Sequence, residues 1–129
     1  MKLDELELLA GRQPAPIRNA LPPVIEFATG AVKAIVGGRE GRDLARILER
    51  RSELGRSKYG TELQAHNGRR VAVDALQEGA DLVMYATQGL LEATGPDRLD
   101  WAMLQCDAAR LTARALRLHR RAERRRGGR

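Results

Sequence analysis

Aromatic residues and cysteines are scarce in this chain of 129 residues, which contains four aromatic residues and one cysteine, Cys106. A single cysteine excludes a framework of intrachain disulfides. With only two histidines beside it, a tetrahedral zinc site built from this chain is not expected. No apolar run approaches the roughly 20 residues of a membrane span, and the first twelve residues contain no secretory signal. We therefore expect a cytoplasmic protein without a membrane partner.

Basic residues are absent from residues 71–96, although the chain contains 23 of them. The segment has the periodicity of one long helix, and its polar residues recur at spacings of three or four, which places them on one helix face. This acidic stripe consists of Asp74, Glu78, Asp81, Tyr85, Gln88 and Glu92. Like charges one turn apart destabilise a helix, so exposed faces usually mix both signs. A cation from outside the helix, either an arginine or a metal ion, is expected beside the stripe.

Five helices separated by glycine and proline are predicted. They span residues 3–10, 22 or 23 to 36, 39–56, 68–94, and 97 or 100 onward. Asn67 is placed to cap the fourth helix, and no alternating strand pattern or internal repeat is present. We expect an all-α protein whose four main helices form a bundle in a single domain, 1–129. Its core would cover about residues 20–120, and its basic tail, 121–129, would be frayed.

The last helix has apolar residues at alternating spacings of three and four, which is typical of a heptad seam. The seam consists of Trp101, Leu104, Ala108, Leu111, Ala115 and Leu118. Such a seam packs against another helix, either in this chain or in a second copy. An oligomer is therefore compatible with the sequence.

Two pairs of acids could carry chemistry. Glu49 and Glu53 lie one turn apart on the third predicted helix, and Glu78 and Asp81 lie one turn apart on the fourth. If these helices pack antiparallel with those faces inward, the four carboxylates converge, and they cannot all stay ionised and unpaired in a partly buried site. Mg²⁺ and Mn²⁺ prefer such oxygen ligands and are commonly shared with substrate phosphates.

The segment EGADLVMY, from Glu78 to Tyr85, resembles the E-x-x-D-x-x-x-Y half of the motif of MazG-like nucleoside triphosphate pyrophosphohydrolases. That family has an E-x-x-E on the preceding helix, where this chain has E-x-x-x-E from Glu49 to Glu53. Glu53 is favoured as the upstream ligand because it lies nearer the loop. The resemblance covers about residues 40–95. The loop KYGTELQAHNGR, with the helix that follows it, is further similar to small phage-encoded members of this group, some of which act on purine deoxynucleotides.

The resemblance implies an all-α MazG-like bundle completed by oligomerisation, as a dimer or tetramer. It implies Mg²⁺-dependent hydrolysis, with Mn²⁺ as a substitute, of a nucleoside triphosphate such as dGTP or dATP to the monophosphate and pyrophosphate. A phage-encoded member would act in the host cytoplasm. The implied metal ligands and catalytic residues are Glu49, Glu53, Glu78 and Asp81. The loop and Tyr85 would bind substrate, with Lys58 and Arg69 on the phosphates and Asn67 and Tyr85 positioning the nucleotide.

Structural roles remain open for the same residues. The acidic stripe could be a solvated face, Tyr85 could be a core residue with a bonded hydroxyl, and Lys58 could be solvated. Asp74 could be a further metal ligand, although pairing with Arg69 or Arg70 is favoured. Trp101 is expected to pack in the seam.

Functions of other classes also remain open. Five arginines of the last helix recur at spacings of four and three, a pattern that can follow nucleic-acid phosphates. They are Arg110, Arg114, Arg117, Arg121 and Arg124. Against this function, no helix-turn-helix signature is present and aromatic residues for base stacking are few. A host-protein-binding phage protein without catalysis is the third alternative. P-loop, GxSxG and HExxH motifs are absent.

Overall fold

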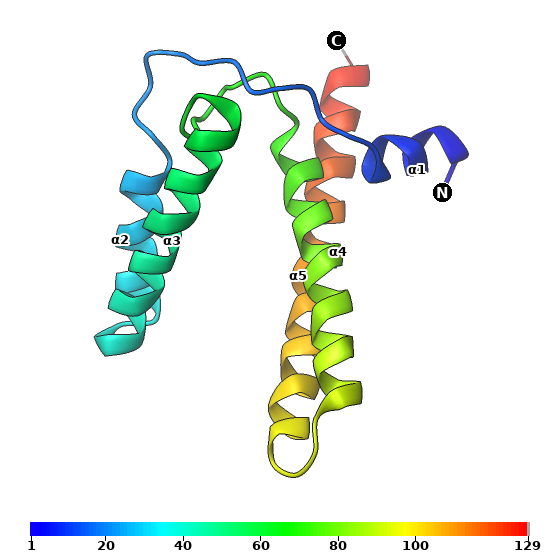
Figure 1. The fold of residues 1–129 in the computed structure, drawn as a ribbon. Helices are drawn as coiled ribbons and strands as arrows, with labels where there is room; N and C mark the ends of the chain where they lie inside the picture. The colour runs from blue at the N-terminus through cyan, green and yellow to red at the C-terminus, as the bar shows by residue number, and fades with distance from the viewer. Residues whose placement is uncertain (129) are drawn as a thin grey trace. The chain divides into compact units, whose positions relative to one another are not determined.

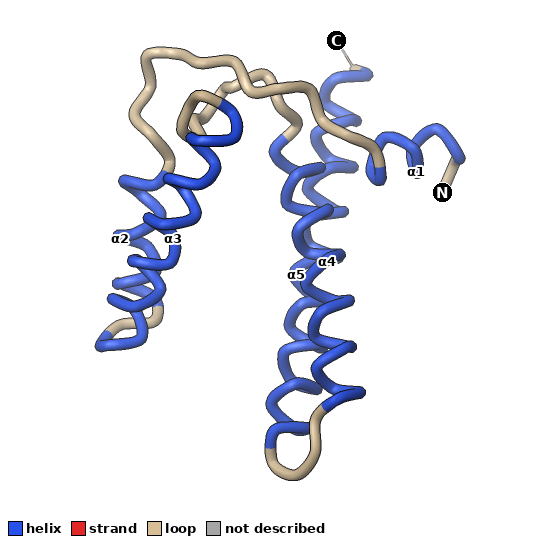
Figure 2. Tube along the Cα trace, in the orientation of Figure 1, coloured by secondary structure: helices blue, strands red, loops and turns tan. Residues whose placement is uncertain are grey.

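The computed structural model describes residues 1–128, which are all-helical apart from loops and one isolated bridge between Pro23 and Gln64. The five helices are α1 (Leu3–Ala10), α2 (Ile25–Ile35), α3 (Gly38–Tyr59), α4 (Val71–Glu92) and α5 (Asp97–Gly127) (Figures 1 and 2). The predicted all-α class is confirmed for the described residues. Within that range, no helix combines the length and the apolar character needed to cross a membrane.

The chain forms two compact units, each described by itself. One comprises residues 14–69 and contains α2 and α3. The other comprises residues 1–13 and the chain from residue 70 onward, and it contains α1, α4 and α5. The single domain with a core at about residues 20–120 and the four-helix MazG-like bundle stay predictions.

α4 and α5 form an antiparallel hairpin that packs through small residues (Figure 1). The buried residues of α4 include Gly79, Ala86 and Gly89. A Cβ added at Gly79 would lie 2.5 Å from Oγ1 of Thr112, and one added at Gly89 would overlap the ring of Trp101. The two helices therefore approach each other at distances that only glycine permits at these two positions.

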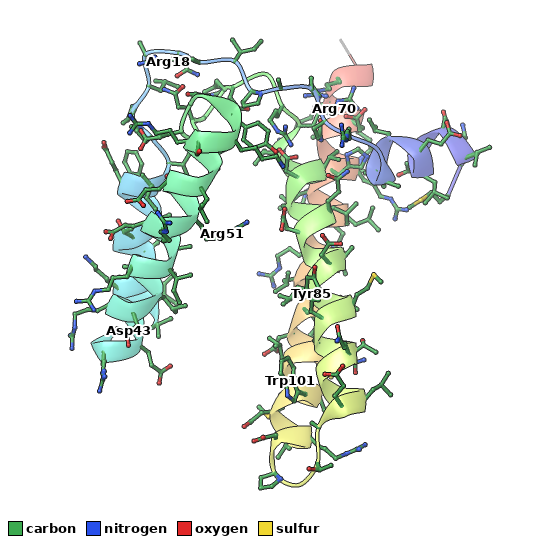
Figure 3. All side chains as sticks on the ribbon, viewed as in Figure 1. Arg18, Asp43, Arg51, Arg70, Tyr85 and Trp101 are labelled. Atoms are coloured by element: carbon green, nitrogen blue, oxygen red, sulfur yellow. The ribbon has the colours of Figure 1, made fainter. Side chains whose placement is uncertain are left out.

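The predicted heptad seam on α5 is divided between two surfaces. One row of residues, seven apart, faces α4; it consists of Trp101, Ala108 and Ala115. The packing role predicted for Trp101 is confirmed, since its ring covers Gly89 (Figure 3). The other row, which we call the leucine row, is 37–48% exposed and consists of Leu104, Leu111 and Leu118. Half of the seam is therefore used within the hairpin, and half is left at the surface.

α1 is attached to the α4–α5 hairpin by hydrogen bonds at its carboxyl end. Nε2 of Gln77 donates to the carbonyl oxygens of Leu9 (2.9 Å) and Gly11 (2.7 Å). Glu5 also lies 3.6 Å from Nε of Arg120 on α5. Carbonyls at a helix end lack partners within the helix, so Gln77 both caps α1 and fixes it to α4.

α2 and α3 form the second hairpin, which also packs through a small residue. A Cβ at the buried Gly41 would lie 3.2 Å from the carbonyl oxygen of Val32. None of the residues of α2 is buried, and Phe27 and Ile35 are largely exposed. This hairpin therefore buries little apolar surface by itself.

Four predicted helix boundaries are wrong by two or three residues, and one of them is the end of α4, which lies at Glu92 rather than at residue 94. α2 begins at Ile25 rather than at a proline, because Pro23 pairs with Gln64 in a bridge. α3 continues three residues beyond Arg56, to Tyr59, and ends at Gly60, whose φ of 73° is left-handed. α4 begins at Val71 rather than at residue 68, and its N-cap, Arg70, makes no side-chain cap bond.

The predicted capping role of Asn67 is also wrong. Its Oδ1 accepts a hydrogen bond from the backbone N–H of Arg69 (3.1 Å), two residues on, so the side chain closes a turn before α4 begins. At the other end of the chain, α5 continues through Gly127, within the tail that was expected to fray. Residue 129 lies outside the described residues.

We predict that Gly89→Ala destabilises the α4–α5 hairpin by about 1–3 kcal/mol, the usual cost of overpacking a close contact. The added methyl group must displace the Trp101 ring. Gly55→Ala is the matched control, because nothing lies within 4 Å of an added Cβ there. That control should gain about 0.5–1 kcal/mol from helix propensity. Urea unfolding followed by circular dichroism measures both changes, and equal stabilisation by the two substitutions would contradict the close packing.

Candidate functional site

The acidic stripe lies on the face of α4 that points away from α5. Glu78, Asp81 and Tyr85 are exposed, whereas Gly79 and Ala86 of the opposite face are buried. Within residues 1–128, neither Glu78 nor Asp81 forms an ion pair. The two carboxylates are thus one turn apart, hydrated and available to a cation. Asp81 also borders a cavity of about 510 Å³ beside α1.

The upstream pair, Glu49 and Glu53, lies on α3 and is exposed. Oε2 of Glu53 accepts a hydrogen bond from Nη1 of Arg50 at 2.8 Å, an i,i+3 ion pair with both side chains about two-thirds exposed. An exposed pair of this kind contributes only about 0–1 kcal/mol. A metal ion could therefore displace Arg50 at little cost. Glu49 forms no ion pair with any described residue.

The two pairs belong to different units of the chain. Within the described residues, no group of three or more His, Cys, Asp or Glu side chains is arranged to hold a metal ion. Each unit supplies two adjacent carboxylates. Mg²⁺ is commonly held by one or two carboxylates, with water and substrate phosphates completing its octahedron. The donor set of each pair therefore fits Mg²⁺ better than zinc, which prefers nitrogen and sulfur ligands.

The predicted phosphate-binding residues lie on or after the end of α3. Nζ of Lys58 lies 5.0 Å from the ring centroid of Tyr59, a cation–π contact that leaves the ammonium at the surface. Arg69 donates from Nη1 to the carbonyl oxygen of Pro14 at 2.9 Å. Lys58 is thus accessible to a phosphate, whereas Arg69 also holds the connector before α2.

Asn67 is 7% exposed, and both its backbone and its side chain have structural roles. Its carbonyl oxygen accepts a hydrogen bond from the N–H of Ile17 at 2.8 Å, and its Oδ1 accepts one from the N–H of Arg69. Tyr85, by contrast, is 65% exposed on the acidic stripe (Figure 3). The hypothesis that Tyr85 is a core residue is therefore wrong for the unit that contains α4. Its exposed ring is accessible to a ligand.

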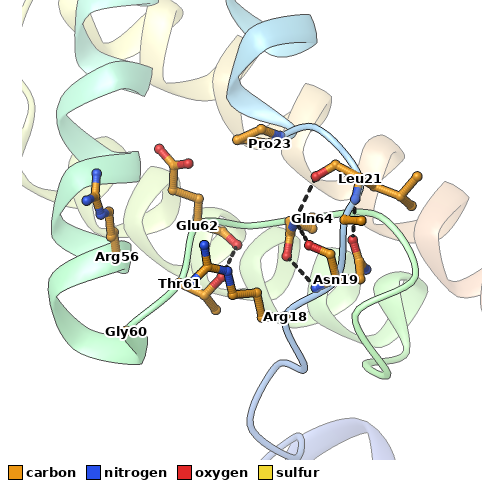
Figure 4. A pocket seen from close by; sticks show the side chains of 10 residues that line it. Arg18, Asn19, Leu21, Pro23, Arg56, Gly60, Thr61, Glu62 and Gln64 are labelled. Carbon is orange, nitrogen blue, oxygen red and sulfur yellow. Dashed lines mark hydrogen bonds between the residues drawn. The ribbon is translucent and has the colours of Figure 1, made fainter.

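Sequence reasoning missed a polar network around Gln64, which is only 9% exposed. Its Nε2 donates to the carbonyl oxygens of Asn19 (2.9 Å) and Leu21 (2.7 Å), and its Oε1 accepts from the N–H of Asn19 (3.0 Å) (Figure 4). Nδ2 of Asn19 donates to the carbonyl oxygen of Ala65 at 2.8 Å. These bonds join segments 45 residues apart, so no local pattern could have revealed them.

The Gln64 network borders a cavity of about 480 Å³ within the α2–α3 unit. Arg18, Arg56, Thr61 and Glu62 line it together with Gln64 (Figure 4). None of the residues predicted to bind metal or substrate lines this cavity. The connector at residues 13–23 contains four prolines, and its backbone groups must find partners elsewhere, but its composition does not indicate which residues supply them.

Comparisons with family models, curated proteins and solved structures found no match to this chain.

We predict that Gln64→Glu loosens the connector before α2. A carboxylate cannot donate to the carbonyl oxygens of Asn19 and Leu21, so two hydrogen bonds become repulsive contacts. Trypsin cleavage after Arg18 should accelerate about tenfold, which corresponds to about 1.4 kcal/mol of opening free energy. Gln88→Glu, an exposed change of the same charge, should leave the cleavage rate unchanged. Equal rates in the two variants would show that the network does not hold the connector.

Proposed function

We propose that the protein is a metal-dependent nucleoside triphosphate pyrophosphohydrolase of MazG-like type. The observation that carries the proposal is the pair Glu78 and Asp81, hydrated and without an ion pair within residues 1–128, on a helix without a basic residue. The E-x-x-D-x-x-x-Y spacing that ends at the exposed Tyr85 supports the same assignment. Similarity of the loop to phage-encoded members supports a purine deoxynucleotide, such as dGTP or dATP, as substrate.

In the proposed reaction, a water oxygen bonds to the α-phosphorus and the water loses a proton to solvent. The bond between the α-phosphorus and the bridging oxygen breaks, and that oxygen leaves with pyrophosphate. The products are the nucleoside monophosphate and pyrophosphate. Bound Mg²⁺, or Mn²⁺ in its place, would lower the pKa of water and neutralise charge on the phosphates. Glu78 and Asp81, with Glu53 and Glu49, are the proposed ligands.

The remaining proposed residues bind substrate. Lys58 and Arg69 would contact phosphate oxygens, since charge-assisted hydrogen bonds to phosphate are among the strongest available. Tyr85 would stack against or hydrogen-bond the nucleoside. Asn67 would act chiefly by positioning Arg69, since its Oδ1 is bonded to that residue's backbone.

We further propose that the protein works as a homo-oligomer, a dimer or tetramer, through the leucine row of α5. Three leucines seven residues apart form a stripe that a partner helix can bury. They are exposed in the hairpin, where the other half of the seam already contacts α4. Full burial of an exposed leucine side chain contributes roughly 1.5–3 kcal/mol. Because these leucines are 37–48% exposed, the surface still to be buried contributes roughly half of that or less for each residue.

Five exposed arginines that recur along one face of α5 favour a second candidate function, nucleic-acid binding. Residues 110, 114, 117, 121 and 124 all lie at the surface. Binding of this kind weakens steeply as salt rises, because counterions are released from the phosphates. Divalent-dependent turnover of a nucleotide need not show that dependence, so a salt series with duplex DNA separates the two functions.

The assay that tests the proposed function incubates the purified protein with each of the eight common NTPs and dNTPs, with Mg²⁺ or with EDTA. Monophosphate and pyrophosphate formed only with the metal would support it. Absence of product at high protein concentration, with Mn²⁺ also supplied, would overturn it and favour a binding protein.

We predict that Glu78→Gln and Asp81→Asn each lower kcat/KM by at least about 100-fold, the scale of losing one contact that stabilises a charged transition state. Both are exposed, so circular dichroism should show an unchanged fold. Glu92→Gln is the matched control on the same stripe and should keep wild-type activity. Near-normal turnover by either variant would exclude these residues as metal ligands.

The upstream pair is tested in the same assay. Glu53→Ala should abolish activity. Glu49→Ala shows whether the E-x-x-x-E segment contributes one metal ligand or two. Unchanged activity in Glu49→Ala would leave Glu53 as the upstream ligand.

We predict that Leu111→Glu lowers the molar mass in solution, measured by light scattering after size exclusion, to that of a single chain. The substitution places a charge in the middle of the leucine row. Ala113→Glu, an exposed position on another face of α5, should leave the mass unchanged. A monomeric wild-type protein would rule out the proposed oligomer directly.

A further inference from the structure

The cavity in the α2–α3 unit is lined by cations from two separate segments. Arg18 comes from the connector before α2, and Arg56 comes from the last turn of α3. Figure 4 shows the Arg18 side chain extending toward Thr61 and Glu62, with Arg56 on the neighbouring helix. Both arginines therefore line the same cavity, which has a volume of about 480 Å³.

Neither guanidinium is neutralised. Within residues 1–128, Arg18 and Arg56 form no side-chain hydrogen bond and no ion pair, although Glu62 lines the same cavity. Two guanidiniums beside one carboxylate leave a net charge of +1 around the cavity. Each guanidinium offers five N–H donors in a planar fork suited to carboxylate or phosphate oxygens.

Another cavity lined by charged residues has a different character. It lies beside α1 and α5 and has a volume of about 450 Å³. Its arginines meet three acids, and two of these acids are ion-paired: Glu5 with Arg120, and Glu123 with Arg70 and Arg126. The charges around this cavity are balanced within the protein. The cavity therefore has no excess positive charge that would attract an anion.

The wall of the cavity in the α2–α3 unit is held in place by hydrogen bonds, and those of Gln64 are partly buried. Gln64 makes three bonds to the backbone of Asn19 and Leu21, and the N–H of Val24 donates to the carbonyl oxygen of Leu63 at 2.8 Å. Arg18 directly precedes Asn19, so its backbone is anchored where its side chain enters the cavity. A fixed wall lowers the entropy lost when a ligand binds.

We propose that this cavity binds a small phosphorylated molecule. A phosphate carries up to two negative charges and several acceptor oxygens, so it can use two guanidiniums from different segments, whereas a carboxylate is satisfied by one. The hydroxyl of Thr61, now bonded to the carbonyl oxygen of Glu62 at 3.2 Å, can rotate to donate to the ligand. Glu62 can accept hydrogen bonds from hydroxyl or amino groups beside the phosphate.

This site goes beyond the proposed hydrolysis, because it shares no residue with the proposed metal or substrate site. It requires no metal ion. It can therefore be tested on the full-length protein in EDTA, where metal-dependent turnover does not occur.

The experiment titrates inorganic pyrophosphate into ¹⁵N-labelled full-length protein in EDTA at constant ionic strength and records amide chemical shifts. Shifts should concentrate at Asn19, Thr61 and the side-chain amide of Gln64. Arg18→Gln and Arg56→Gln should each weaken binding at least tenfold. Arg42→Gln, which removes an exposed charge elsewhere on α3, should change the affinity less than twofold.

Three results would overturn the site: no saturable shifts, shifts centred on the arginines of α5, or equal affinity in Arg18→Gln and wild type. Acetate at the same ionic strength distinguishes phosphate from carboxylate, and equal affinity for both would overturn the assignment to phosphate. The spectra of the variants report directly whether each is folded. Glu78→Gln should retain pyrophosphate binding in EDTA, so failure of the hydrolysis proposal and failure of this one give different results.

Discussion

The close contact between α4 and α5 is the constraint on which the surfaces of this protein depend. Because Gly79 and Gly89 carry no side chain, the helices approach until Thr112 and Trp101 fill the space. The contact is built mainly from small residues, and Val73 is the largest fully buried side chain within residues 1–128. Larger apolar residues, including the leucine row, are therefore left outside the hairpin, where they are available to a partner.

The same contact determines where the acidic stripe lies. α4 turns its glycines and Ala86 toward α5, so residues on the opposite face, Glu78 and Asp81 among them, are directed outward. Hydration makes stacked carboxylates tolerable without arginines on the same helix, because repulsion between charges is weak in water. An exposed stripe is thus compatible with a solvated face. The same exposure leaves two adjacent carboxylates free to bind a hard cation. Of the two interpretations, a cation site is favoured by the exposed Tyr85, which completes the E-x-x-D-x-x-x-Y spacing.

Local periodicity predicted what depends on neighbours in sequence. It placed α1 at its observed boundaries and predicted the other helices to within a few residues. It also identified Trp101 as a packing residue. The seam on α5 was predicted as one surface, yet its two rows separate because α4 contacts only one. The Asn67 cap failed because its side chain closes a local turn with Arg69 instead. The Gln64 network was not predictable, since its bonds span more than 40 residues.

The arginines differ in whether an acidic side chain lies close enough to form an ion pair with them. Arg70 and Arg120 pair with Glu123 and Glu5, and these pairs tie α5 to the start of α4 and to α1. Arg50 pairs one turn along its own helix. A guanidinium paired with acids in this way helps to hold its unit together. Its charge is already balanced, so it attracts an anionic ligand less strongly. Arg18 and Arg56 have no such pairing within residues 1–128 and lie at a cavity whose wall is fixed by Gln64. In a chain with 23 cations, it is therefore the pairing and placement of each arginine, rather than the net charge, that distinguishes a structural residue from one positioned to bind an anion.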